Sequence, residues 1–246
     1  MANRDQIFHL PIKQTKWAFD EDVTNVFSDM INRSIPGYSI IKNMIGKLSQ
    51  KFVKNYTYIY DLGCSLGDIA ISIQNNLQVT GCKIIAIDNS PSMIARFKQK
   101  MKKIPTYQNH TTLIKIVEGD INKIVIKNAS MVVLNFTLQF IKVEERKNLL
   151  KSIYAGLNSE GVLILSEKFK FDDPRINQII INLHHDFKKN HGYSNLEIIQ
   201  KDNLLKNFMI IDTIENQRKN LRNLGFTHVD LWFQYLNFGS FIAIKS

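Results

Sequence analysis

Short apolar runs separated by amphipathic stretches dominate the chain from residue 58 onward. Runs that are apolar almost throughout lie at 58–62, 83–88, 113–119, 129–136 and 161–167. Strands of this composition are buried on both faces, which is typical of a parallel sheet covered by helices. Helical patterns lie between most of the runs, at 68–76, 90–101 and 144–157. The pattern therefore predicts an α/β fold built from successive strand–helix units.

The two ends of the chain carry different patterns. Residues 1–55 predict mainly helices, interrupted by a Pro-Gly turn, "IPGYS", that carries Tyr38. A long helical region at 173–224 precedes two apolar runs whose cores are separated only by residues 237–239, which indicates a hairpin. We predict a seven-stranded, mostly parallel sheet with an antiparallel last strand. The chain is expected to form one domain, 1–246, with 1–55 as a helical N-terminal lid segment.

The segment "YDLGCSLGDIAISI", residues 60–73, joins a predicted strand to a predicted helix. A dinucleotide-binding loop has the pattern G-x-G-x-x-G. Here Gly63, Ser65 and Gly67 follow Asp61, so the loop is poor in glycine. Such a loop approaches a pyrophosphate less closely, whereas a ligand without phosphates tolerates it.

Polar residues stand where the following strands end. Asp88 suits a ribose diol, because a carboxylate offers two acceptor oxygens and repels a 2′-phosphate. Asp120 is placed to accept from an adenine amino group, with the Ile121 amide near a ring nitrogen, and Asn135 ends the fourth strand. Acids and Asn at such positions also cap helices. Their succession at strand ends nevertheless favours adenosine without phosphate, and hence S-adenosylmethionine, over a dinucleotide.

Composition limits the remaining function classes. No apolar run approaches the roughly 20 residues that a membrane-spanning helix needs, and the first residues have no apolar signal core. Two cysteines, Cys64 and Cys82, fit a reducing compartment, so we expect a cytoplasmic protein without membrane association. The formal net charge of +10 fits either a polyanionic partner or a lysine-rich composition. Its basic residues are spread thinly and are not interleaved with aromatic ones, so direct RNA binding is not expected.

At these residues the chain resembles class I methyltransferases, and more narrowly the carboxy-S-adenosyl-L-methionine synthase family. The segments that carry the resemblance run through the whole chain: "FDEDVTNVFSDMINRSIPGYS", "YDLGCSLG", "IIAIDNSPSMI", "EGDI", "NASMVVLNFTLQF", "LSEKFKF", "HHDFKKNHGYSNLEIIQK" and "LWFQYLNFGS". The resemblance implies a Rossmann-like class I methyltransferase fold.

The resemblance also implies a reaction. The family converts S-adenosylmethionine and prephenate into carboxy-S-adenosyl-L-methionine and phenylpyruvate, and a tRNA carboxymethyltransferase uses the product on the wobble uridine. It further implies a homodimer. Neither a set of metal ligands nor a catalytic base stands out in the sequence, so no metal is expected. The family's cofactor contacts would fall on Tyr38, Gly63, Cys64, Ser65, Asp88, Asn89, Asp120, Ile121 and Asn135.

One position departs from the family pattern. The family has an arginine that pairs with the transferred carboxylate, and this chain has Asp202 there. A second anion repels a carboxylate, whereas a guanidinium binds it through two hydrogen bonds. Lys201, Lys206 or Arg33 is expected to supply the positive charge; otherwise the carboxylate is not bound in the usual way.

Two other functions remain open from the sequence. One is an S-adenosylmethionine-dependent methyltransferase acting on a small molecule or RNA, and the other is a non-catalytic subunit of a tRNA-modifying complex. A metal site at His184 and His185 is disfavoured, because adjacent histidines on a helix point about 100° apart and no third ligand is spaced nearby.

Overall fold

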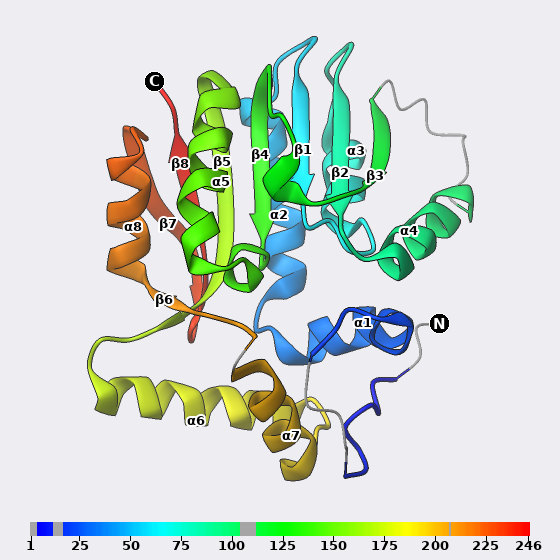
Figure 1. Ribbon diagram of the computed structural model, residues 1–246, viewed down its shortest axis with the longest axis vertical. Helices are drawn as coiled ribbons and strands as arrows, with labels where there is room; N and C mark the ends of the chain where they lie inside the picture. Colours follow the sequence, from blue (N-terminus) through cyan, green and yellow to red (C-terminus); the bar gives the residue numbers. More distant parts are fainter. Residues whose placement is uncertain (1–3, 12–16, 104–111, 207) are drawn as a thin grey trace.

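The computed structural model of the chain describes residues 4–11, 17–103, 112–206 and 208–246 (Figure 1). Within them one sheet runs in the order β3-β2-β1-β4-β5-β8-β7, with the short β6 paired to β5. The strands are β1 (Tyr58–Leu62), β2 (Lys83–Asp88), β3 (Leu113–Glu118), β4 (Ala129–Asn135), β5 (Leu157–Lys170), β6 (Asp212–Thr213), β7 (His228–Tyr235) and β8 (Phe238–Ile244).

The helices lie over both faces of this sheet and at the carboxyl ends of its parallel strands. They are α1 (Glu21–Ser34), α2 (Tyr38–Phe52), α3 (Asp68–Asn76), α4 (Pro91–Lys103), α5 (Val143–Gly156), α6 (Pro174–Asn190), α7 (Asn195–Lys206) and α8 (Ile214–Asn223), with short 3-10 turns η1 (Ile121–Lys123) and η2 (Leu138–Phe140). None of the described helices is long and apolar enough to cross a bilayer.

The predicted sheet is confirmed in its main features. Strands β1 to β5 pair in parallel, and β8 lies antiparallel to β5 and β7. The turn predicted at 237–239 is wrong. Tyr235 pairs with Phe238, so the chain reverses at Leu236 and Asn237, where Leu236 takes a positive φ of 53°. Phe238 is already part of β8, because its ring is buried against the sheet and is therefore unavailable to a turn.

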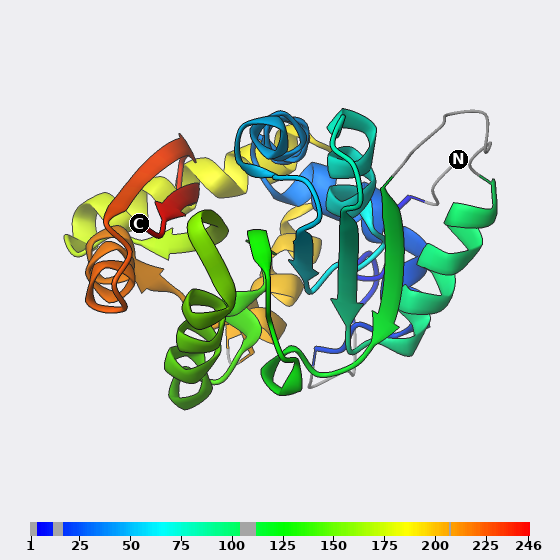
Figure 2. The ribbon, with the colours of Figure 1, turned by 90° about the horizontal axis from the view of Figure 1, so that it is seen from above.

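Two apolar clusters hold the layers together. One joins the sheet to α5 and α8, and the other joins the opposite face to α2, α3 and α4. Seen from above, α5 and α8 lie on one side of the sheet and α2 and α3 on the other (Figure 2). Because both faces are covered, the strands between them are apolar almost throughout, as the sequence pattern indicated.

A third group of elements lies at the carboxyl ends of the parallel strands. Figure 1 shows α1, α6 and α7 there, below the sheet. The first described residues, 4–11, are not helical, and α1 begins at Glu21, where the Asp20 side chain accepts from the Val23 amide. A small apolar cluster ties this N-terminal segment to α1, α4 and α7. These elements cover the edge of the sheet where open α/β folds bind ligands.

The loop after β1 depends on Gly67. Its φ of 77° lies in the left-handed region, and it caps α3. A Cβ atom there would come within 2.1 Å of the Phe97 ring, which α4 packs against the loop. Gly67 therefore sets both the direction of α3 and its distance from α4.

Replacing Gly67 with alanine should lower the free energy of unfolding by about 2 kcal/mol or more, since the left-handed conformation alone costs roughly 1–2 kcal/mol. Urea denaturation followed by circular dichroism measures this. Gly119→Ala is the matched control, because its Cβ would meet only the Val117 side chain, at 4.0 Å. Equal stability of the two variants would contradict the assignment.

Candidate functional site

A large cavity opens at the carboxyl ends of the parallel strands. Its volume is about 760 Å³, and its walls come from the ends of β1, β2, β4 and β5, from the turn after β3, and from α1, α2, α6 and α7. The nine residues predicted to contact the cofactor all line it: Tyr38, Gly63, Cys64, Ser65, Asp88, Asn89, Asp120, Ile121 and Asn135. Residues that lie up to about 100 positions apart in the sequence thus share one site.

Asp88 is the polar centre of the loop region. One carboxylate oxygen accepts from the Ser65 amide at 2.8 Å, and the other accepts from the Ser90 amide at 2.9 Å. Burial raises the pKa of Asp88, and these backbone donors partly counter the shift. A carboxylate has about four acceptor sites, more than these backbone donors use, so Asp88 can still accept from a ligand hydroxyl in the cavity.

Asn135 and Asp120 face the same cavity. Asn135 Oδ1 is buried and has no hydrogen-bond partner among the described residues. A buried acceptor without a partner is costly, and a ligand donor in the cavity would satisfy it. Asp120 caps η1 through the Asn122 amide at 2.9 Å, and its second oxygen has no hydrogen-bond partner among the described residues. Both groups fit the polar groups of an adenosyl ligand.

Three further buried groups lie in the cavity wall or directly behind it. Burial strongly raises the pKa of the Cys64 thiol and of the Tyr38 phenol, so both stay neutral. Asp61 lies behind the loop, where it accepts from the Ala70 amide at 3.1 Å and anchors the start of α3. Burial raises its pKa to about 7.

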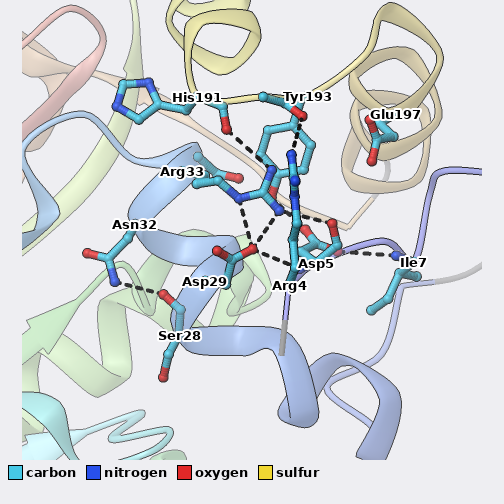
Figure 3. Close-up of polar contacts among 12 residues, drawn as sticks. Arg4, Asp5, Ile7, Ser28, Asp29, Asn32, Arg33, His191, Tyr193 and Glu197 are labelled. Carbon is cyan, nitrogen blue, oxygen red and sulfur yellow. Dashed lines mark hydrogen bonds and ion pairs between the residues drawn. The ribbon is translucent and has the colours of Figure 1, made fainter. Parts of the chain in front are cut away.

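Arg33 does not belong to the cavity, contrary to its place among the expected carboxylate partners. Its guanidinium binds Asp29, with Nε at 2.8 Å, and donates to the Asp5 carbonyl at 2.9 Å (Figure 3). It also stacks over the Tyr193 ring, 4.1 Å from the centroid. Arg33 therefore fastens the N-terminal segment to α1 and to the turn after α6, and its charge is already neutralised.

Lys201 and Asp202 do line the cavity, but each has partners of its own. Lys201 Nζ donates to Ser34 Oγ at 3.0 Å and lies 3.9 Å from Asp5 Oδ2. Burial lowers its pKa to about 7, although Asp5 opposes the shift. Asp202 contacts Lys188 Nζ and His185 Nε2, each at 2.7 Å. Burial alone would raise the pKa of Asp202, but Lys188 holds it below its ordinary value.

Three residues that the sequence analysis did not assign to the site complete this end of the cavity: Lys168, His184 and Lys188. His184 Nε2 lies 2.8 Å from the Ser34 carbonyl oxygen, and burial lowers its pKa to about 2, so the ring is neutral. Lys168 follows the fifth apolar run in "LSEKFKF". The rule that selected polar residues at the ends of four strands would have offered both Glu167 and Lys168 at the fifth, and only Lys168 lines the cavity.

The two adjacent histidines thus have separate contacts, to Ser34 and to Asp202. Across the described ranges, no three His, Cys, Asp or Glu side chains are grouped to hold a metal ion. Next to Lys168 on β5, Glu167 belongs to the other face of the sheet, near Arg146. Burial raises the pKa of Glu167 to about 8, despite the Arg146 guanidinium.

Residues 59–161 match the family model described as a methyltransferase domain. The carboxy-S-adenosyl-L-methionine synthases of Escherichia coli (strain K12) and Salmonella paratyphi B are each 51% identical to this chain over 247 residues, which is 100% of this chain and 98% of theirs. The chain belongs to the carboxy-S-adenosyl-L-methionine synthase family. This confirms the resemblance found in its motifs, and the membership covers the whole chain.

Solved structures agree on the fold. Magnesium protoporphyrin IX methyltransferase from Synechocystis PCC 6803, with bound SAH, superposes with a TM-score of 0.60 at 14% identity, covering 88% of this chain and 87% of that one. Human N-acetylserotonin methyltransferase in complex with SAM gives 0.59 at 18% identity. The match covers 92% of this chain but only 55% of the human protein. The predicted class I methyltransferase fold is confirmed.

Asp88→Ala should weaken the binding of S-adenosylmethionine at least tenfold, because a hydrogen bond to a charged group contributes about 1.5–3 kcal/mol. Titration calorimetry measures the affinity, and circular dichroism checks that the loop anchored by Asp88 still folds. Asp186→Ala on α6 is the control, since that carboxylate is exposed and lies outside the cavity. Unchanged affinity in Asp88→Ala would reduce Asp88 to a loop anchor.

Proposed function

We propose that this protein converts S-adenosylmethionine and prephenate into carboxy-S-adenosyl-L-methionine and phenylpyruvate. One observation carries the proposal: a chain 51% identical to synthases of that name along its whole length brings all nine expected contacts to one cavity. A volume of about 760 Å³ accommodates a cofactor together with a small second substrate.

The adenosyl part would lie over the ends of β1, β2, β3 and β4. Asp88 would accept from the ribose hydroxyls, and Asp120 with the Ile121 amide would hold the adenine edge. The buried, unpaired Asn135 Oδ1 would accept from the amino group of the methionyl part, which removes the cost of leaving it unsatisfied. The Tyr38 ring would lie near the sulfonium, where an aromatic face attracts a cation.

S-adenosylmethionine supplies a methyl group acidified by the neighbouring sulfonium, and this methyl receives the carboxyl carbon that prephenate loses as its ring becomes aromatic. The methyl proton and the hydroxide lost from prephenate together make water, so the atoms balance. The protein's contribution is to position the two substrates, to exclude solvent and to stabilise carboxylate charge at the end of the cavity bounded by β5, α6 and α7.

Incubation of the purified protein with both substrates should yield phenylpyruvate and carboxy-S-adenosyl-L-methionine in equal amounts, measured by mass spectrometry. Omitting either substrate is the control. If prephenate is not consumed but an added acceptor becomes methylated, the chain is an ordinary methyltransferase. If neither reaction occurs while S-adenosylmethionine binds, it is a non-catalytic subunit.

The partners follow from the same proposal. Prephenate is the second substrate, and the product would be passed to a tRNA carboxymethyltransferase that modifies the wobble uridine. Two free, buried cysteines support a reducing, cytoplasmic setting. No contact with tRNA is proposed for this chain itself.

A homodimer is the remaining part of the proposal, and α6 supports it. Ile176, Ile179 and Leu183 lie three or four residues apart on this helix and are 49%, 51% and 46% exposed. Spacing of this kind forms an apolar stripe on one helix face. An exposed apolar stripe on a soluble domain is typical of a protein–protein interface.

Ile179→Glu should convert a dimer into a monomer, because a carboxylate buried in an apolar interface is strongly unfavourable. Analytical ultracentrifugation measures the mass. Val125→Glu, at a site that is 77% exposed and far from α6 in the sequence, is the control and should leave the mass unchanged. A wild-type monomer at micromolar concentration would overturn this part of the proposal.

A further inference from the structure

The end of β5 places an ammonium group in the cavity without an anionic partner. Lys168 lines the cavity, and among the described residues its Nζ makes no hydrogen bond or ion pair. Lys168 Nζ lies over the Phe238 ring, 5.7 Å from the ring centroid. Burial and the neighbouring Lys188 lower the pKa of Lys168 to about 8, against the pull of Asp202. A desolvated cation of this kind favours an anionic ligand.

The other buried cations at this end of the cavity already have partners within the protein. Lys188 binds Asp202 at 2.7 Å, and Lys201 is held by Ser34 and Asp5. Lys142 and Lys206 also line the cavity, but both are exposed, so water screens their charge. Lys168 is therefore the cation best able to bind a carboxylate away from water.

The sheet order sets which ligand group Lys168 faces. In the sequence β3-β2-β1-β4-β5, the strand that carries Lys168 lies beyond β4, on the side away from Asp88 and Asp120. Asn135 of β4 pairs with Ser166, two residues before Lys168. A ligand whose adenosine lies over β2 and β3 therefore directs its reacting end, not its adenine, toward Lys168.

Asp202 cannot take this role. Its carboxylate repels another anion, and Lys188 and His185 already satisfy it. Its direct ion pair is with Lys188, and Lys168 makes no hydrogen bond or ion pair with it.

We propose that Lys168 is the substrate-binding residue that holds the carboxylate to be transferred, first on prephenate and then on the product. This inference rests on the function proposed above and adds the residue that replaces the family arginine. The bond between the ring and the carboxyl carbon breaks, and the bond to the methyl carbon forms, while the carboxyl oxygens stay beside one ammonium. Lys168 itself gains and loses no bond.

Steady-state kinetics with Lys168→Met tests the proposal. At saturating S-adenosylmethionine, the KM for prephenate should rise at least tenfold, while the affinity for S-adenosylmethionine measured by calorimetry stays within twofold. Lys168→Arg should recover much of the loss, because it restores the charge. Lys170→Met is the matched control, since this lysine lies two residues further on the same strand, is exposed and does not line the cavity. It should match the wild type.

The outcomes separate this inference from the proposed function. A wild type that forms phenylpyruvate together with a Lys168→Met variant of unchanged KM overturns the role of Lys168 alone. Equal losses of prephenate and S-adenosylmethionine binding also overturn it, because Lys168 would then serve the cofactor or the fold. A wild type that never consumes prephenate overturns the function first. If Lys168→Met does not fold, Lys168→Gln keeps a polar head group without the charge and is read in the same way.

Discussion

The architecture of the site depends on the Asp88 carboxylate at the end of β2. It accepts from the Ser65 amide of the loop after β1 and from the Ser90 amide that leads into α4. The Gly63 and Cys64 amides add hydrogen bonds to the Ile87 carbonyl, at 2.8 and 2.9 Å. Two strands, one loop and one helix are thereby fixed relative to each other, so the face presented to a ligand is set before any ligand binds.

Much of the fold could be predicted because burial on both faces imposes a readable pattern. The limits predicted for β1, β2 and α3 agree with the structure, since each has an apolar interior and a clear end: Gly63 follows β1, β2 ends at Asp88 and α3 ends at Asn76. The cluster at the strand ends was predictable for a topological reason: parallel strands finish at the same edge, so residues 61 to 135 converge. Predicting this cluster required only the positions of the strands along the sequence, not the side-chain packing.

The cationic end of the cavity was not predictable in this way, because it is built by contacts between distant segments. Asp29 neutralises Arg33, which also donates to the Asp5 carbonyl. Lys201 donates to Ser34, which lies 167 positions away, and its ammonium is near the Asp5 carboxylate. No local sequence pattern indicates which lysine has a hydrogen-bond or ion-pair partner within the protein and which has none. The role of Asp202 was not predictable either. Its position in the sequence suggests that it repels a substrate carboxylate, whereas in the structure it binds Lys188 and His185.

The buried ionisable groups around the cavity also link folding to protons. The pKa values of Asp61 and Glu167 are raised from 3.8 and 4.5 to about 7 and about 8. Folding therefore takes up protons when the pH lies between the ordinary and the raised values. The contribution of these acids to stability falls as the pH rises to about 8. The pKa values of Lys201 and Lys168 are lowered from 10.5 to about 7 and about 8. Folding therefore releases protons when the pH is above these lowered values, and the contribution of the two lysines to stability then rises with pH. Their summed contribution is smallest near neutral pH. There the apolar clusters must supply the stability, and an anion bound at the cavity would add to it by drawing a proton onto the lysine beside it.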